Sequence, residues 1–264
     1  MKFKHLVLDK KGAVSTLSFN RPDQLNAVTA HMLEELIKAV EMIAQDSDVR
    51  VLIITGMGRA FCSGADMDLL QHVIDLKGGA RFRRVLRGLI QRAINSFEQL
   101  EKPVIAAVNG PAAGGGVELA LACDFRIASE NARFIFTEVK LGMIPDGGGI
   151  PRLTRVLGCG KAKEIILLGR TIDGREAERM GLVNKCVPAE QLMDEAKQWS
   201  DQLMNCAPLA VGVAKRIIDQ AMDVDLMTAL EMTGFAMQEL LSSEDFQEGI
   251  RAFLEKRKPA FKGA

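Results

Sequence analysis

The segment from residue 104 to residue 120 constrains the fold more than any other part of the sequence. It begins with the apolar run Val104–Val108, passes through small residues, and continues through Gly114–Gly116 into a helical pattern. Glycines let a ligand approach the backbone closely, and the first turn of a helix presents unpaired N–H groups at its positive end. Such a segment can hold an anion or a polarised carbonyl oxygen. Close packing of a helix on a strand would require the same glycines, so the segment alone leaves both explanations open.

Short β-rich runs alternate with helical patterns over the first two thirds of the chain, which predicts an α/β architecture. The apolar residues from Leu33 to Ile43 recur at helical spacing after Thr29, so this segment should form an amphipathic helix with one buried face. The glycines and arginines of residues 78–84 predict a mobile loop that enters a helix. The expected strands are Val14–Phe19, Val51–Thr55, Val104–Val108 and Phe125–Ala128.

The C-terminal part of the chain has a different pattern. After Pro188 the β-rich runs disappear, and successive helical patterns continue nearly to the end of the chain. No linker is clear enough to separate two independent domains. We therefore expect a core of residues 1–190 followed by a C-terminal helical region of residues 191–264.

Charge and cysteine content narrow the class of protein. The 264 residues carry 34 lysines and arginines and 34 aspartates and glutamates, so no net charge attracts nucleic acid or an anionic membrane. The five cysteines form no Cys-x-x-Cys pair, which favours reduced thiols. The first residues lead into a strand without an apolar segment, so we expect no export signal. We predict a cytoplasmic protein with no nucleic-acid or membrane partner.

A second segment of small residues follows the run Val51–Thr55. This segment, Phe61–Asp66 with the sequence FCSGAD, can also expose backbone N–H groups. Together with Asn109–Asp124 and the closing Phe253–Phe261, it resembles the enoyl-CoA hydratase/isomerase, or crotonase, family over nearly the whole chain. The resemblance implies an α/β spiral of repeated β-β-α units with a C-terminal helical oligomerisation region. It also implies an acyl-CoA thioester substrate.

The resemblance assigns roles to particular residues. The N–H groups of Ala65 and Gly115 would form an oxyanion hole that polarises the thioester carbonyl. Glu118 and Glu138 would be the acid and base groups of an enoyl-CoA hydratase, which adds water to a 2-enoyl-CoA. Without the resemblance, Glu118 could simply be favourably placed at a helix N-terminus, and Glu138 could be a solvent-exposed charge before Lys140.

Asp146 leaves the reaction type open. Hydratases of this family commonly carry glycine at this position, whereas some isomerases carry a catalytic aspartate. The alternative function is therefore an enoyl-CoA or dienoyl-CoA isomerase that uses Glu138 and Asp146. Aspartate before glycine also favours a turn, so a purely structural role is a further explanation. A non-catalytic acyl-CoA-binding protein is a third possibility, and the retained carboxylates count against it.

Coenzyme A would be part of the substrate, so no separate cofactor is expected. By the resemblance, Arg59 and the Lys256 of a neighbouring subunit would meet its phosphates, and Ala65, Asp66 and Gly115 would lie around the bound thioester. The same resemblance predicts a homo-oligomer, either a trimer or a dimer of trimers (a homohexamer). Surface lysines and arginines are mostly solvated, so Arg59 and Lys256 could instead be ordinary surface charges that bind no phosphate.

The sequence predicts no metal site and no nucleotide-binding loop. The segment Gly158–Ala162 resembles a phosphate loop only in part, because Ala162 stands where that motif has a magnesium-binding Ser or Thr. The histidines are far apart in the sequence and match no zinc-binding pattern. They are His5, His31 and His72.

Overall fold

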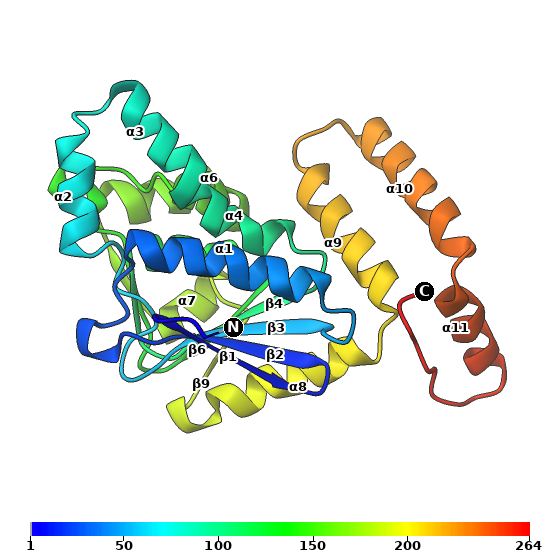
Figure 1. Ribbon diagram of the computed structural model, residues 1–264. Coiled ribbons are helices and arrows are strands. Elements are labelled where there is room, and N and C mark those ends of the chain that lie inside the picture. The colour runs from blue at the N-terminus through cyan, green and yellow to red at the C-terminus, as the bar shows by residue number, and fades with distance from the viewer. Residues whose placement is uncertain (1) are drawn as a thin grey trace.

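The computed structural model describes residues 2–264, and a twisted six-stranded sheet forms its centre (Figure 1). The strand order is β1-β2-β3-β4-β6-β9, with β1 antiparallel to β2 and all other neighbours parallel. Parallel strands buried on both faces are near-continuous apolar runs, which is the pattern that made β3 and β4 recognisable. The strands are β1 (Leu6–Lys11), β2 (Val14–Phe19), β3 (Val51–Gly56), β4 (Val104–Val108), β6 (Phe125–Ser129) and β9 (Lys185–Val187).

Helices cover both faces of this sheet. Alternate side chains of β3 point in opposite directions, so Leu52 packs into the larger core under α1, whereas Ile53 packs against α8 on the other face. The predicted amphipathic helix is confirmed as α1 (Ala30–Gln45), and the Thr29 side chain caps it by accepting a hydrogen bond from the Met32 N–H. The other helices of the core are α4 (Arg92–Gln99), α5 (Gly115–Leu121), α6 (Gly149–Leu167), α7 (Gly174–Met180) and α8 (Leu192–Met204).

A small second sheet lies next to the site region. It contains β5 (Pro111–Ala113), β7 (Arg133–Ile135) and β8 (Thr171–Asp173) in that order. These strands have three residues each, too short to show a recognisable alternation, so the sequence did not predict them. Because β5 follows β4 after only two residues, the small sheet fixes the position of the glycines that come next.

The segment predicted as a mobile loop is helical, so that prediction is wrong. It forms α3 (Gly79–Val85), which continues through a π-helical turn (Leu86–Gln91) into α4. The two glycines only turn the chain after α2 (Met67–Asp75), since Gly78 and Gly79 both have positive φ. The arginines that follow are good helix formers, which explains why helix begins at once.

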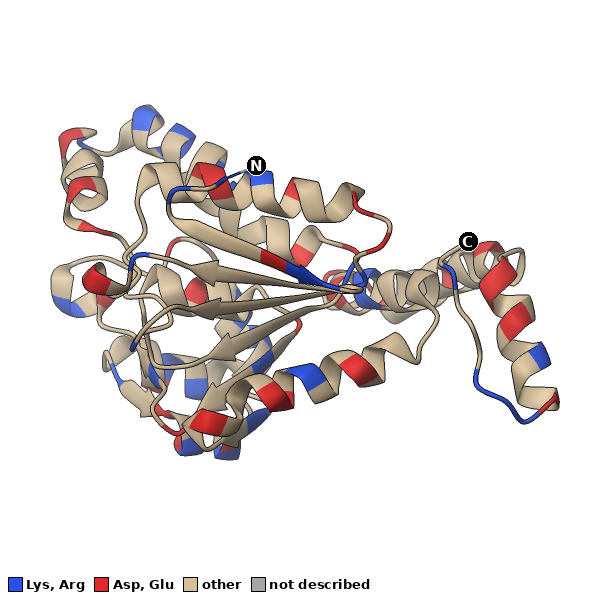
Figure 2. Cartoon of the chain, turned by 60° about the horizontal axis from the view of Figure 1, so that its bottom comes forward, with Lys and Arg blue, Asp and Glu red and all other residues tan. Residues whose placement is uncertain are grey.

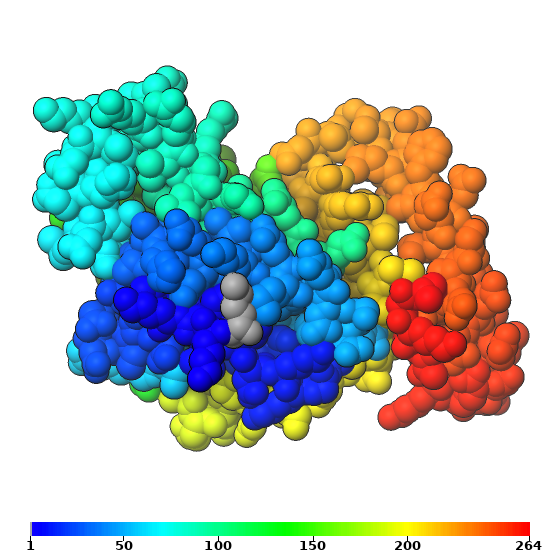
Figure 3. All heavy atoms as spheres, viewed as in Figure 1, coloured from blue at the N-terminus to red at the C-terminus, as the bar shows by residue number. Residues whose placement is uncertain are grey.

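The helical C-terminal part is confirmed. Its first helix packs on the core, and the later helices extend away from it. The helices α9 (Pro208–Ala221), α10 (Leu226–Leu241) and α11 (Glu244–Leu254) extend to one side in Figures 1 and 3. Directly after the predicted domain boundary at residue 190, however, α8 still packs on the central sheet. The boundary itself stays a prediction. None of the helices in residues 2–264 is long and apolar enough to cross a membrane.

Charged residues of both signs are spread over the helices and loops, and the central strands carry few of them (Figure 2). This distribution agrees with the equal numbers of acidic and basic residues in the sequence. Any anionic group must therefore be recognised by local features of the fold.

Candidate active site

The two segments of small residues lie against each other. The Phe61 N–H donates to the Pro111 carbonyl at 3.0 Å, and the Ala113 N–H donates to the Cys62 carbonyl at 2.9 Å. A Cβ on Gly116 would lie 2.1 Å from the Cys62 carbonyl oxygen, and real Cβ atoms essentially never come that close. Glycine is therefore required at this point of contact. The loop that contains Ala65 is thus held against the first turn of α5.

The loop is held from its other side by the residue before the cap of α1. The Val28 N–H donates to the Gly64 carbonyl at 2.7 Å, and the Asp66 N–H donates to the Val28 carbonyl at 2.9 Å. A Cβ on Gly64 would lie 3.5 Å from the Gly115 nitrogen, so these two residues are neighbours in space. Gly64 also has a φ of 86°, which favours glycine. The N–H of Ala65 follows directly on this fixed residue.

Two backbone N–H groups at this junction are available to a ligand. Within residues 2–264, neither the Ala65 N–H nor the Gly115 N–H donates a hydrogen bond to a protein acceptor. Gly115 is the first residue of α5, so its N–H lies at the positive end of the helix dipole. Two free donors on adjoining, well-held segments fit an oxyanion hole, and their binding of a thioester oxygen stays a prediction.

Glu118 projects from the first turn of α5 into a buried environment and is only 4% exposed. Its Oε1 atom accepts a hydrogen bond from the Gly149 N–H at 2.8 Å. Burial, helped by the nearby charges of Asp146 and Glu138 and opposed by the hydrogen bond from Gly149, raises the pKa of Glu118 to about 7. A carboxyl group with such a pKa can exchange protons near neutral pH. The alternative of a merely favourable helix-end charge does not explain this burial.

The glycines after Asp146 make room for Glu118, a role that the sequence analysis missed. A Cβ on Gly147 would lie 2.7 Å from Glu118 Oε2, and a Cβ on Gly149 would lie 3.0 Å from Glu118 Oε1. The sequence shows this glycine run, but it gives no sign that a carboxylate 31 residues earlier occupies the space. Gln91 was also missed; its Nε2 donates to the Asp146 carbonyl at 2.9 Å and holds the turn.

Glu138 and Asp146 join Glu118 at the same place. Glu138 begins the 3-10 helix Glu138–Leu141, and its Oε1 would be 3.6 Å from a Cβ on Gly114. Burial raises the pKa of Glu138, and the charge of Asp146 adds to this effect. Burial likewise raises the pKa of Asp146. Three partly or fully buried carboxyl groups are therefore close enough to affect one another's pKa, and two of them, Glu118 and Glu138, lie near the glycines at the start of α5.

The raised pKa of Glu118 predicts that its replacement by glutamine stabilises the fold at high pH. Between the unfolded pKa near 4.5 and the folded pKa near 7, the native state holds a proton that the unfolded state has lost. Stability therefore falls as pH rises through this window. We expect Glu118→Gln to remove a penalty of up to about 3 kcal/mol at about pH 8 and little at about pH 4.

Denaturant unfolding of both proteins at the two pH values measures this difference, because any pH-independent effect of the amide cancels. An equal difference in unfolding free energy at both pH values would contradict the raised pKa.

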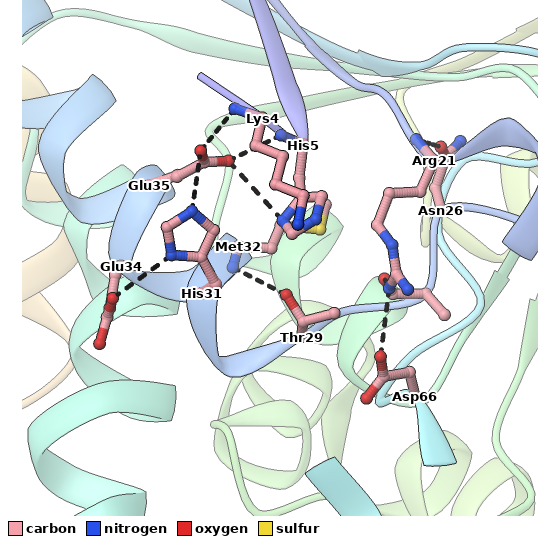
Figure 4. Close-up of polar contacts among 11 residues, drawn as sticks. Lys4, His5, Arg21, Asn26, Thr29, His31, Met32, Glu34, Glu35 and Asp66 are labelled. Carbon is pink, nitrogen blue, oxygen red and sulfur yellow. Dashed lines mark hydrogen bonds and ion pairs between the residues drawn. The ribbon is translucent and has the colours of Figure 1, made fainter. Parts of the chain in front are cut away.

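Of the residues predicted to contact coenzyme A, Asp66 is tied into the loop, whereas Arg59 and Lys256 are exposed. The Asp66 carboxylate caps α2 by accepting the Leu69 N–H at 2.9 Å, and it lies 3.3 Å from Arg21 Nη1 (Figure 4). Its side chain therefore holds the loop. Arg59 is exposed after β3, and Lys256 is exposed after α11, in the part of the chain that extends away from the core. The role of these three residues in binding coenzyme A stays a prediction.

Comparison with known proteins identifies the family. A sequence model of the enoyl-CoA hydratase/isomerase family matches residues 9–264. The chain belongs to this family. It is 41% identical to a short-chain-enoyl-CoA hydratase of Clostridium acetobutylicum, over 98% of this chain and 97% of the relative. It is 39% identical to a crotonyl-CoA hydratase of Syntrophomonas wolfei, over 99% of each chain.

Solved structures agree with this assignment. An enoyl-CoA hydratase from Bacillus anthracis superposes with a TM-score of 0.91 at 39% identity, over 99% of this chain and 100% of that one. A structure from Streptomyces coelicolor, described as an enoyl-CoA hydratase, superposes with a TM-score of 0.93 at 32% identity, over 100% and 96%. The predicted crotonase-like α/β fold with a helical C-terminal region is thereby confirmed.

Proposed function

We propose that this protein is an enoyl-CoA hydratase, which adds water across the C2=C3 double bond of a 2-enoyl-CoA thioester to give a 3-hydroxyacyl-CoA. One observation carries the proposal: the N–H groups of Ala65 and Gly115, which have no partner within residues 2–264, lie on segments that adjoin the buried Glu118 and the half-buried Glu138. The hydratase names of two full-length relatives support it. This reaction needs an acid, a base and an oxyanion site, and it uses no separate cofactor.

The reaction assigns a step to each group. One ionised carboxylate takes a proton from water while the water oxygen attacks C3 of the enoyl group. The electron pair of the double bond moves onto the thioester oxygen, and the N–H groups of Ala65 and Gly115 stabilise the resulting enolate. The enolate collapses as the second carboxyl group gives its proton to C2. The two carboxyls have then exchanged one proton, and its return resets the site.

The raised pKa values suit this exchange. An ionised neighbour disfavours a second negative charge, so one proton shared by Glu118 and Glu138 is favoured over two carboxylates. A pKa near the operating pH also lets one group serve as an acid and the other as a base.

The test is turnover of a short 2-enoyl-CoA, such as crotonyl-CoA, in ¹⁸O-labelled water. We expect one labelled oxygen in the 3-hydroxyacyl product by mass spectrometry. Migration of the double bond in 3-enoyl or dienoyl substrates, without hydration, would instead establish an isomerase. Binding without turnover of any of these substrates would favour a non-catalytic acyl-CoA-binding protein.

Asp146 is the one observation that favours the isomerase, because it lies half-buried beside Glu138. As a hydratase, the protein should tolerate Asp146→Gly with less than about a tenfold loss of kcat, whereas removing an acid or base group costs about 10²–10⁴-fold. Steady-state hydration kinetics measure this effect. Asp146→Asn, which keeps the turn-forming side chain, separates a turn effect from a charge effect. A loss of 10²-fold or more in both variants would make Asp146 a catalytic group.

We also propose that the chain forms a homo-oligomer, as a trimer or a dimer of trimers. The helix α10 has no buried residue, and its large apolar side chains are widely exposed. Large apolar side chains gathered on one exposed helix are typical of a protein–protein contact. Light scattering should give the mass of three or six copies, and a monomer mass would overturn this proposal. The exposed side chains on α10 and α11 include Leu226, Met227, Leu230, Phe235, Phe253 and Leu254.

A cytoplasmic location is part of the same proposal, and the cysteines support it. All five are free thiols. Cys62 is fully buried beside the site, and burial raises its pKa to about 12. A thiol with such a pKa is not a nucleophile at neutral pH, so Cys62 serves in packing.

A further inference from the structure

Three potential metal ligands meet at the start of α1 (Figure 4). His31 and Glu35 are one turn apart on α1, and His5 lies immediately before β1. One ligand atom from each of the three residues lies within 4.8 Å of the others. The histidines are far apart in the sequence, which predicted no metal site, but the rings of His5 and His31 are 5.4 Å apart between centroids.

The separations between the ligand atoms suit a small divalent ion. His31 Nε2 lies 3.3 Å from Glu35 Oε1, and His5 Nδ1 lies 3.9 Å from Glu35 Oε2. Tetrahedral zinc with bonds of about 2.0–2.1 Å places its ligand atoms about 3.4 Å apart. The pair on α1 already has this separation. The ligand atom of His5 lies within 4.8 Å of the other two, so its side chain would move closer when the ion binds.

His5 offers a nitrogen that has no other use. Its Nδ1 atom is buried and has no hydrogen-bond partner within residues 2–264, which is an unfavourable state for a polar atom. An imidazole nitrogen without a hydrogen-bond partner can present its lone pair to a metal ion.

Neighbouring groups already orient the other two ligands. The oxygens of Glu35 accept the backbone N–H groups of Lys4 at 2.6 Å and His5 at 2.9 Å, which fixes the carboxylate and leaves further lone pairs. Glu34 Oε2 lies 3.7 Å from His31 Nδ1, on the far side of the ring from Nε2. This distance is too long for a hydrogen bond, but a small movement would let Glu34 accept the N–H that a metal-binding histidine usually donates to a carboxylate.

We propose that His5, His31 and Glu35 bind one divalent transition-metal ion of the zinc class, with water completing the coordination. The half-exposed His31 gives the ion a route from solvent. The ion would join the segment before β1 to the start of α1. Val28, just before the cap of α1, holds the Ala65 loop through two hydrogen bonds. By fixing the start of α1, the bound ion would therefore stabilise the position of this loop without touching substrate.

Zinc titration of the metal-free, full-length protein tests the proposal. Cys159 and Cys206 are exposed thiols that can bind zinc themselves, so the reference protein carries Cys159→Ser and Cys206→Ser. In competition with a chromophoric chelator, we expect one Zn²⁺ per chain. A free Zn²⁺ concentration of about 100 times the Kd should raise Tm by roughly 5 °C or more.

Variants decide which side chains hold the ion. His31→Ala, at a half-exposed position where folding is not at risk, should weaken Zn²⁺ binding by at least about tenfold and remove the Tm shift. His72→Ala, an exposed histidine on α2, is the matched control and should change neither. Absence of binding, or equal affinity in His31→Ala and the reference protein, would overturn the proposal. Those results would leave the three residues as an ion-pair cluster.

Discussion

Replacing Glu118 by glutamine should lower kcat for hydration by about 10²–10⁴-fold, because the amide can neither take up nor release the proton that the reaction moves. The side chain keeps its shape, and its oxygen can still accept the Gly149 N–H. The KM for the enoyl-CoA should change little, since the N–H donors are untouched. Steady-state kinetics with crotonyl-CoA measure both constants.

A matched control separates the loss of a catalytic carboxyl group from the general effect of removing one negative charge. Glu190→Gln removes one exposed carboxylate outside the site and should leave kcat unchanged. Because Glu118→Gln is expected to be at least as stable as the parent protein above neutral pH, a lower rate there cannot be ascribed to unfolding. Activity of Glu118→Gln within about tenfold of the parent would remove Glu118 from the acid and base groups.

The effects on kcat of replacing Glu118 and Glu138 should also depend on each other. If Glu118 and Glu138 pass one proton between them, either single replacement by glutamine stops the exchange. The double replacement should then cost much less than the product of the two single losses, as is typical of residues that act as a unit. Multiplicative losses would indicate two independent contributions.

The parts of the fold that were predictable are those whose signal is local. The strand β4 and the glycines at the start of α5 were visible because the apolar run and the small residues are close together in the sequence, and α1 was visible through its helical period. The three-residue strands and the helix α3 were not. Strands so short have no period, and glycines next to arginines are compatible with either a loop or a helix start.

The candidate site was only partly predictable, for a related reason. Family resemblance placed Glu118 and Glu138, but the pKa of Glu118 depends on burial and on a turn 31 residues later in the chain. Likewise, His5 and His31 meet only because the residue before β1 lies beside α1. Contacts between distant segments leave no pattern in a single sequence, so they had to come from the structure.

The second large effect that we expect comes from removing a backbone N–H of the predicted oxyanion hole. Gly115→Pro should lower kcat by about 10²–10³-fold, because proline has no N–H to stabilise the enolate. Proline is well tolerated at the first position of a helix, which Gly115 occupies in α5, and the preceding Gly114 has the backbone freedom to adapt. Circular dichroism and Tm should therefore stay close to those of the parent protein.

Gly115→Ala is the matched control, since it adds a Cβ but keeps the N–H. Apart from the adjoining backbone, a Cβ on Gly115 would meet no atom of residues 2–264 within 4 Å, so the fold should accept alanine without strain. Because that open space is also where the thioester would lie, alanine can raise KM through contact with substrate, whereas proline must lower kcat. Equal kcat values for a folded Gly115→Pro and Gly115→Ala would mean that the Gly115 N–H does not stabilise the enolate. The three glycines would then serve only the close packing of α5 on the loop of Cys62, which was the other explanation of the segment.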